Sequence, residues 1–150
     1  MIYIGSDHGG FGLKEKIKQF LKESGHEYVD VGPFAFDPAD DYPDYARLVA
    51  EKVSGDPSDF GILICRSGQG VNITANKFKG VRSALVWNEK ESVASKSDDM
   101  VNILALPSDY ITDDEGIRIV KVWLETPWPR EGRHVRRVEK IREIETENFK

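Results

Sequence analysis

The stretch Phe-Gly-Ile-Leu-Ile-Cys at Phe60–Cys65, followed at once by Arg-Ser-Gly-Gln-Gly at residues 66–70, decides the fold. The first part is apolar throughout, as expected of a strand buried on both faces of a parallel sheet. The glycines of the second part permit a tight turn, and the residues from Val71 to Lys77 are predicted to form a short helix. This strand–turn–helix unit indicates an α/β protein.

The regions on either side repeat this alternation. Short apolar runs predict strands at residues 2–4, 28–31, 83–87 and 102–106. Helical spacing predicts helices over residues 13–21, around 46–53, over 89–96, after a capping box of Thr112 and Glu115, and over about 135–148. We therefore predict a three-layer, Rossmann-like fold with a five-stranded parallel sheet, in a single domain over residues 1–150.

Composition and charge exclude several classes of function. The formal net charge of −5 argues against general binding to nucleic acid or to a membrane surface. No apolar run approaches the ~20 residues of a membrane helix, and the first residues lack the pattern of a signal peptide. A single cysteine cannot form an internal disulfide. We expect a cytoplasmic protein.

Ligands in such folds bind at the turns that follow the carboxyl ends of the strands. The first turn offers Asp7 and His8, and an imidazole can donate to a sugar or phosphate oxygen. The plainer interpretation is that Asp7 only caps the next helix. In the turn after Cys65, backbone N–H groups and Arg66 would favour a thiolate. Here the plainer interpretation is a buried, inert cysteine.

A basic segment, residues 130–137, leads into the last predicted helix. Arg133 and Arg137 are four residues apart, so a helix would project both guanidinium groups from one face, where a pair of them suits phosphate. Alternatively, the segment is a solvated helix face whose cations pair with Glu139, Glu143 and Glu145.

Taken together, these motifs resemble those of type B ribose-5-phosphate isomerases and the related subunits of galactose-6-phosphate isomerase. The resemblance covers nearly the whole chain, and several separated motifs in one order are far more specific than any single motif. It rests on Ser6–Phe11 with Leu13 and Lys14, Asp41–Ala46, Gly61–Cys65, Ser67–Gly70, Ala75–Lys77, Asn102–Ala105, Gly132–His134 and Arg137.

The resemblance implies an isomerase that interconverts ribose 5-phosphate and ribulose 5-phosphate through an enediolate. Cys65 would be the base that moves the proton between carbons. The turn residues Ser67, Gly68, Gln69 and Gly70 would hold the enediolate oxygen. Asp7 and His8 would contact sugar oxygens, and the basic segment would hold the substrate through Arg133, His134 and Arg137.

The resemblance also implies a homodimer or tetramer with active sites at the subunit interfaces. The helix at about 135–148 would contact a partner subunit. We expect no metal ion and no organic cofactor.

Four positions depart from the family pattern. Where the family carries a ring-opening His and an Asn, in the loop before the last strand, this chain has Asp98 and Asp99. A phosphate-binding Arg of the family falls on Asp109, and a Gly beside the cysteine is Arg66. We hypothesise that Asp98 replaces the ring-opening His, because a carboxylate can act as a general base. We also hypothesise that Arg66 replaces the missing cation. The alternative for Asp98 and Asp99 is a solvated turn.

These departures leave alternative functions open. The substrate could be another sugar or sugar phosphate, such as a hexose 6-phosphate or allose 6-phosphate, or the chain could be a weakly active subunit of a hetero-oligomeric isomerase. A nucleotide-binding module is a third interpretation. It is disfavoured because the first strand leads into Ser-Asp-His-Gly-Gly rather than Gly-x-Gly-x-x-Gly.

Overall fold

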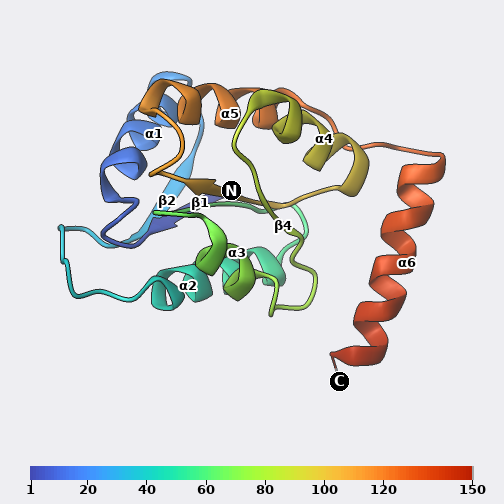
Figure 1. Ribbon diagram of the computed structural model, residues 1–150. Helices are drawn as coiled ribbons and strands as arrows, with labels where there is room; N and C mark the ends of the chain where they lie inside the picture. The colour runs from blue at the N-terminus through green and yellow to red at the C-terminus, as the bar shows by residue number, and fades with distance from the viewer. Residues whose placement is uncertain (150) are drawn as a thin grey trace.

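The computed structural model describes residues 1–149 and places one sheet between two layers of helices (Figure 1). Helices α1, α4 and α5 cover one face of the sheet, and α2 and α3 cover the other. The predicted three-layer α/β fold with five parallel strands is confirmed. The strands are β1 (Ile2–Ser6), β2 (Tyr28–Gly32), β3 (Phe60–Cys65), β4 (Ser83–Leu85) and β5 (Ile103–Pro107); the helices are α1 (Phe11–Glu23), α2 (Tyr42–Gly55), α3 (Gln69–Ala75), α4 (Glu89–Asp99), α5 (Asp113–Glu125) and α6 (Arg133–Asn148).

The strand order is β2-β1-β3-β5-β4, and each neighbouring pair is parallel. The central strand β3 pairs with β1 on one side and β5 on the other, so that Ile62 lies between Ile4 and Leu104. Strand β2 lies on one side of β1 and strand β3 on the other, so the direction in which the chain adds strands to the sheet reverses after β2. Such a switch point opens a crevice at the carboxyl ends of the strands, where the turns after β1 and β3 meet.

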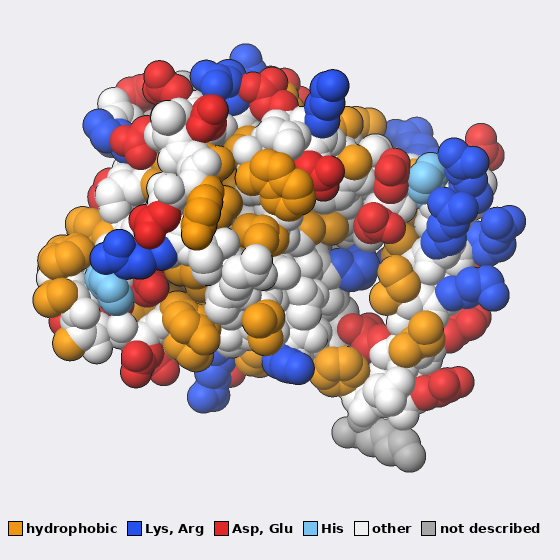
Figure 2. Space-filling view, in the orientation of Figure 1, with side chains coloured by type: hydrophobic (Ala, Val, Ile, Leu, Met, Phe, Trp, Pro, Cys, Tyr) orange, Lys and Arg blue, Asp and Glu red, His pale blue; other side chains and the backbone are white. Residues whose placement is uncertain are grey.

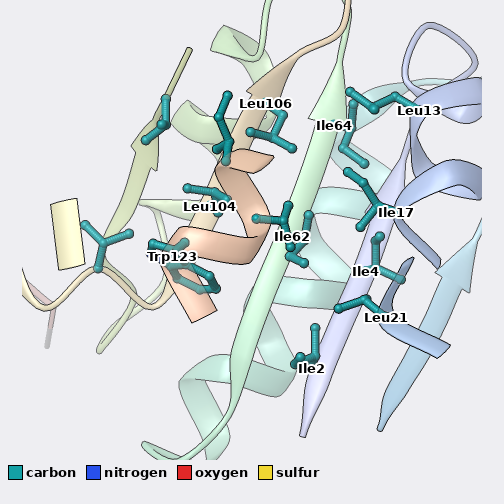
Figure 3. Packing of buried hydrophobic residues seen from close by; sticks show 14 residues of the cluster. Ile2, Ile4, Leu13, Ile17, Leu21, Ile62, Ile64, Leu104, Leu106 and Trp123 are labelled. Carbon is teal, nitrogen blue, oxygen red and sulfur yellow. The ribbon is translucent and has the colours of Figure 1, made fainter. Parts of the chain in front are cut away.

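The side chains of β3 alternate between two cores. Ile62 and Ile64 pack with residues of α1 and α5, as the side chains in Figure 3 show. Leu63 and Cys65 belong to the core on the other face of the sheet, which α2 and α3 cover. Because both faces are covered, the strand needs no polar residue, which explains the uninterrupted apolar run in the sequence.

Two local signals are confirmed at the ends of helices. The hydroxyl of Thr112 accepts from the N–H of Glu115, whose carboxylate accepts from the N–H of Thr112, so the capping box is complete. Gly25 follows α1 with a φ of 73°, and its N–H donates to the carbonyl of Lys22 at 3.2 Å. A glycine is favoured there because other residues rarely adopt positive φ.

Several predicted boundaries are wrong. The strand predicted over residues 83–87 ends at Leu85, and the helix predicted to end at Lys77 ends at Ala75. Helix α3 begins at Gln69 rather than Val71, so part of the glycine-rich turn is helical. Helix α4 continues to Asp99 rather than ending near residue 96. Asp98 and Asp99 therefore form the last turn of a helix and not a loop. The helix ends at Met100, which takes a left-handed conformation with a φ of 51°.

The loop between β2 and α2, residues 33–41, is anchored at its start by Lys14. This fully buried side chain donates from Nζ to the carbonyl of Pro33 at 2.6 Å and to the carboxylate of Asp30 at 2.8 Å. Burial alone would raise the pKa of Asp30, but hydrogen bonds from Lys14 and Lys18 outweigh it and lower the pKa. The far end of this loop contacts the turn that follows β1.

Helix α6 stands away from the rest of the molecule (Figure 1). A groove of about 430 Å³ separates its inner face from the edge of the sheet near β4, as Figure 2 shows. Val138 is buried, but Ile141 and Ile144, the other members of the predicted apolar stripe, are 43% and 59% exposed. The stripe is therefore only partly covered by the described residues. None of the helices within residues 1–149 is long and apolar enough to cross a bilayer.

Candidate active site

Cys65 ends β3 at the carboxyl edge of the sheet. The residue is 4% exposed, and the N–H of Gly68 donates to its Sγ at 3.2 Å. Gly68 reaches this position with a φ of 71°, and a Cβ there would collide with the side chain of Leu85. The local geometry thus needs glycine.

A hollow of about 610 Å³ opens beside this turn. Its lining combines the polar residues Ser67 and Gln69 with Leu85, Trp87, Pro107 and Tyr110. The ring of Tyr42 packs over Gly70 at the start of α3 and leaves no room for a Cβ. A concave site with a few polar groups and an apolar wall suits a small polar metabolite.

The turn after β1 places Asp7 and His8 next to the cysteine turn. The N–H of Asp7 donates to the carbonyl of Ile64 at 3.3 Å, which ties this turn to β3. The Asp7 carboxylate accepts from the N–H of Gly10 at 3.1 Å. Asp7 therefore stabilises the turn just before α1. This role is close to the helix capping considered from the sequence, although the N-cap residue itself is Gly10.

Two residues that sequence reasoning missed hold these turns in place. Asp40 Oδ1 accepts from both the backbone N–H and Nδ1 of His8, at 2.9 Å and 2.7 Å. The hydroxyl of Ser108 joins the two turns, because it lies 2.8 Å from the carbonyl of Gly9 and 3.1 Å from that of Cys65. The only sequence signal for Asp40 was its place in an acidic loop.

Arg66 crosses from the cysteine turn toward the turn after β1. Its side chain occupies the space where a Cβ of Gly9 would lie, so Gly9 is required there. One guanidinium nitrogen, Nη1, is 3.6 Å from the carboxylate of Asp109. Both side chains are substantially exposed, so this ion pair contributes little to stability. The guanidinium therefore stays available to a ligand anion.

The second group of predicted residues lies where α4 meets α6. The carboxylate of Asp98 is 3.9 Å from Nε2 of His134 and accepts from the hydroxyl of Ser97 at 2.9 Å. Arg133 and Arg137 are exposed one turn apart on α6, where Figure 2 shows basic side chains gathered. Asp99 lies at the groove beneath α6.

Within one chain, the structure does not join these two groups. Helix α6 lies at one side of the molecule, whereas α1, which follows the His8 turn, lies at the other (Figure 1). The predicted site residues thus fall into two groups, which we call the candidate half-sites. The first contains Asp7, His8, Cys65, Arg66, Ser67, Gly68, Gln69 and Gly70; the second contains Asp98, Asp99, Arg133, His134 and Arg137.

Comparison with known proteins places the chain in a family. The sequence profile of the family described as Ribose/Galactose Isomerase matches residues 2–141. The chain therefore belongs to the ribose/galactose isomerases, a class of aldose–ketose isomerases. Among its relatives is ribose-5-phosphate isomerase B of Mycobacterium tuberculosis, which is 35% identical over 96% of this chain and 89% of its own length.

Solved structures of type B ribose-5-phosphate isomerases have the same fold. The enzyme from Mycoplasma genitalium, crystallised with bound ribulose 5-phosphate, matches with a TM-score of 0.94 and 47% identity, over 98% of this chain and 97% of its own. The enzyme from Thermotoga maritima matches with a TM-score of 0.88 and 41% identity, over 95% and 97%. The particular family members that this chain resembles are thus the type B enzymes.

Proposed function

We propose that this protein interconverts ribose 5-phosphate and ribulose 5-phosphate. The observation that carries the proposal is the turn after β3, where the N–H of Gly68 points at Cys65 Sγ beside a hollow of about 610 Å³. Similarity over almost the full length to an enzyme that binds ribulose 5-phosphate supports this substrate.

Cys65 is the carbon base in this proposal. The thiolate takes the proton from carbon 2 of the open-chain aldose, and the electron pair of that C–H bond forms the enediolate. Return of the proton to carbon 1, together with transfer of the hydroxyl proton from oxygen 2 to oxygen 1, gives the ketose. Backbone N–H groups between Ser67 and Gly70 hold the oxygen on which charge develops. The loss of one such donor typically costs about 3 kcal/mol of barrier.

The second half-site opens the sugar ring. We assign this role to Asp98, whose carboxylate is half exposed and can accept the proton of the anomeric hydroxyl. His134, 3.9 Å from that carboxylate, supplies an imidazole close to the position where the family carries its histidine. Asp99 would contact sugar hydroxyls beside it.

Phosphate is held by guanidinium groups from both half-sites. Arg133 and Arg137 project from successive turns of α6, which suits bidentate contacts to phosphate oxygens. Arg66 adds a cation from the cysteine turn and offsets the carboxylate of Asp109. Remote binding energy of this kind positions the reacting carbons next to the thiolate.

A complete site then needs two subunits. The cysteine turn of one protomer would meet the end of α4 and the basic part of α6 of its partner. The exposed side chains Ile141 and Ile144, at the groove between α6 and the sheet, give that helix an apolar surface for a second chain. We propose a homodimer, or a tetramer built from such dimers.

A panel of pentose and hexose phosphates, assayed by NMR in D₂O, tests the function. We expect conversion of ribose 5-phosphate, with deuterium entering carbon 1 of the ketose, and loss of both signals in Cys65→Ala. Conversion of a hexose 6-phosphate or allose 6-phosphate alone would reassign the substrate. Inactivity on every sugar phosphate would point instead to a subunit that needs a second, different chain.

A further inference from the structure

The carboxylate of Asp40 is buried against His8. Its side chain is 5% exposed, although most of the loop that carries it, residues 33–41, lies in solvent. Oδ1 accepts from the backbone N–H of His8 at 2.9 Å and lies 2.7 Å from Nδ1 of its ring. One oxygen therefore fixes both the main chain and the imidazole of the same residue.

The other oxygen of Asp40 is not used in this way. Among the described residues, Oδ2 is buried and makes no well-formed hydrogen bond, although the carboxylate lies near the Tyr45 hydroxyl, whose pKa is raised by burial and by this carboxylate. A buried carboxylate whose second oxygen is poorly satisfied gains little stability from its burial, so its contacts with His8 are the feature that needs explanation. Such groups are expected where a residue serves a site.

The imidazole is also constrained from a second side. The ring of Phe36 meets that of His8 edge to face, with centroids 6.4 Å apart, and Phe36 packs in the same way on Phe11 at 6.3 Å. The position and orientation of the histidine ring are thus set by its own turn, by Asp40 and by an aromatic neighbour.

We propose that Asp40 is a positioning residue that holds His8 in one tautomer. The hydrogen bond to Oδ1 places the proton of the neutral imidazole on Nδ1. Nε2 then carries the lone pair and accepts a hydrogen bond from a sugar hydroxyl. The role toward the sugar rests on the proposed function, whereas the tautomer does not.

The tautomer can be measured directly from ¹⁵N chemical shifts of the histidine rings. The chain has three histidines, and the spectrum of His8→Ala identifies the signals of His8. We expect the Nδ1-protonated form in the wild type and in Asp40→Asn, which keeps an acceptor oxygen. In Asp40→Ala we expect that preference to be lost and kcat/KM to fall about tenfold or more.

Asp37→Ala is the matched control, since Asp37 lies in the same loop but is exposed, and its carboxylate accepts from the N–H of Ala39 and not from His8. It should leave both the tautomer and kcat/KM unchanged.

In the His8→Ala background, Asp40→Ala should lower kcat/KM no further. An unchanged His8 tautomer in Asp40→Ala, or an additive loss in the double variant, overturns the proposal. If the wild type lacked isomerase activity but showed the tautomer, only the proposed function would fail.

Discussion

Arg66 and Asp109 are paired twice, through their side chains and through their backbones. Nη1 of Arg66 lies 3.6 Å from the carboxylate of Asp109, and the N–H of Asp109 donates to the carbonyl of Arg66 at 2.9 Å. The turns after β3 and β5 are thereby joined. The resemblance to the family implies a cation at the second of these positions, and we propose that Arg66 supplies it in this chain.

Arg66→Gly should raise KM for ribose 5-phosphate about tenfold with a smaller change in kcat, because it removes a cation and leaves Asp109 to repel phosphate. Adding Asp109→Arg to this variant should restore KM, since it returns the cation to the site. Steady-state kinetics of the two variants test this. Arg47→Ala, which removes an exposed pair with Glu51 on α2, is the control. An unchanged KM in Arg66→Gly would reject the phosphate role.

The separation of the two half-sites predicts complementation between inactive variants. Cys65→Ala and Arg137→Ala damage different half-sites, so a dimer with one subunit of each kind contains one intact site. After unfolding and refolding together, the mixture should recover about a quarter of wild-type activity, given random pairing in a two-fold dimer. Cys65→Ala mixed with Asp7→Ala should recover none, because both changes lie in the same half-site. Equal recovery in the two mixtures would contradict a shared site.

Gly68→Ala should inactivate the enzyme. The added Cβ meets Leu85 and requires a side chain at a φ of 71°, so the N–H that points at Cys65 Sγ must move. We expect a fall in kcat of about a hundredfold, as for a lost oxyanion donor. Gly80→Ala is the matched control, because Gly80 has a φ of 79° but open space around it. Both variants should lose about 1 kcal/mol in urea unfolding, and only Gly68→Ala should lose kcat.

Lys96 should make stability depend on alkaline pH. Burial lowers the pKa of its ammonium group to about 8, although Nζ donates to the carbonyl of Trp123 at 2.9 Å and lies over the Phe60 and Trp123 rings. Between that pKa and the ordinary value of 10.5, the unfolded chain binds the extra proton. The free energy of unfolding should therefore rise with pH across this interval. Urea unfolding of wild type and Lys96→Met from pH 7 to about 10 checks this; parallel curves would refute it.

The fold could be predicted because its signals are local. The apolar run of β3 and the reciprocal cap of Thr112 and Glu115 each identify an element without knowledge of the rest of the chain. The end of α4 carries no such signal. Its left-handed cap is Met100 rather than glycine, and its inner face includes Lys96 and Ser92, which hide the amphipathic pattern.

The candidate site could be predicted only in part. Cys65 and His8 stand at strand ends, where the topology itself indicates a ligand. Asp40 contacts His8 across 32 positions of sequence, through a loop whose path no periodicity reveals. No residue pattern predicts a contact between α6 of one subunit and the cysteine turn of another. Only the resemblance to the family implies a second chain.

The place of β3 in the sheet affects when the protein can fold during synthesis. Its neighbours are residues 2–6 and 103–107, so the middle strand is flanked on both sides only after the chain has been translated through β5. Until then, β3 has one edge without a neighbouring strand, and helices cover its faces only in part. Nascent chains on the ribosome should therefore resist protease late, once the segment through Pro107 has left the exit tunnel.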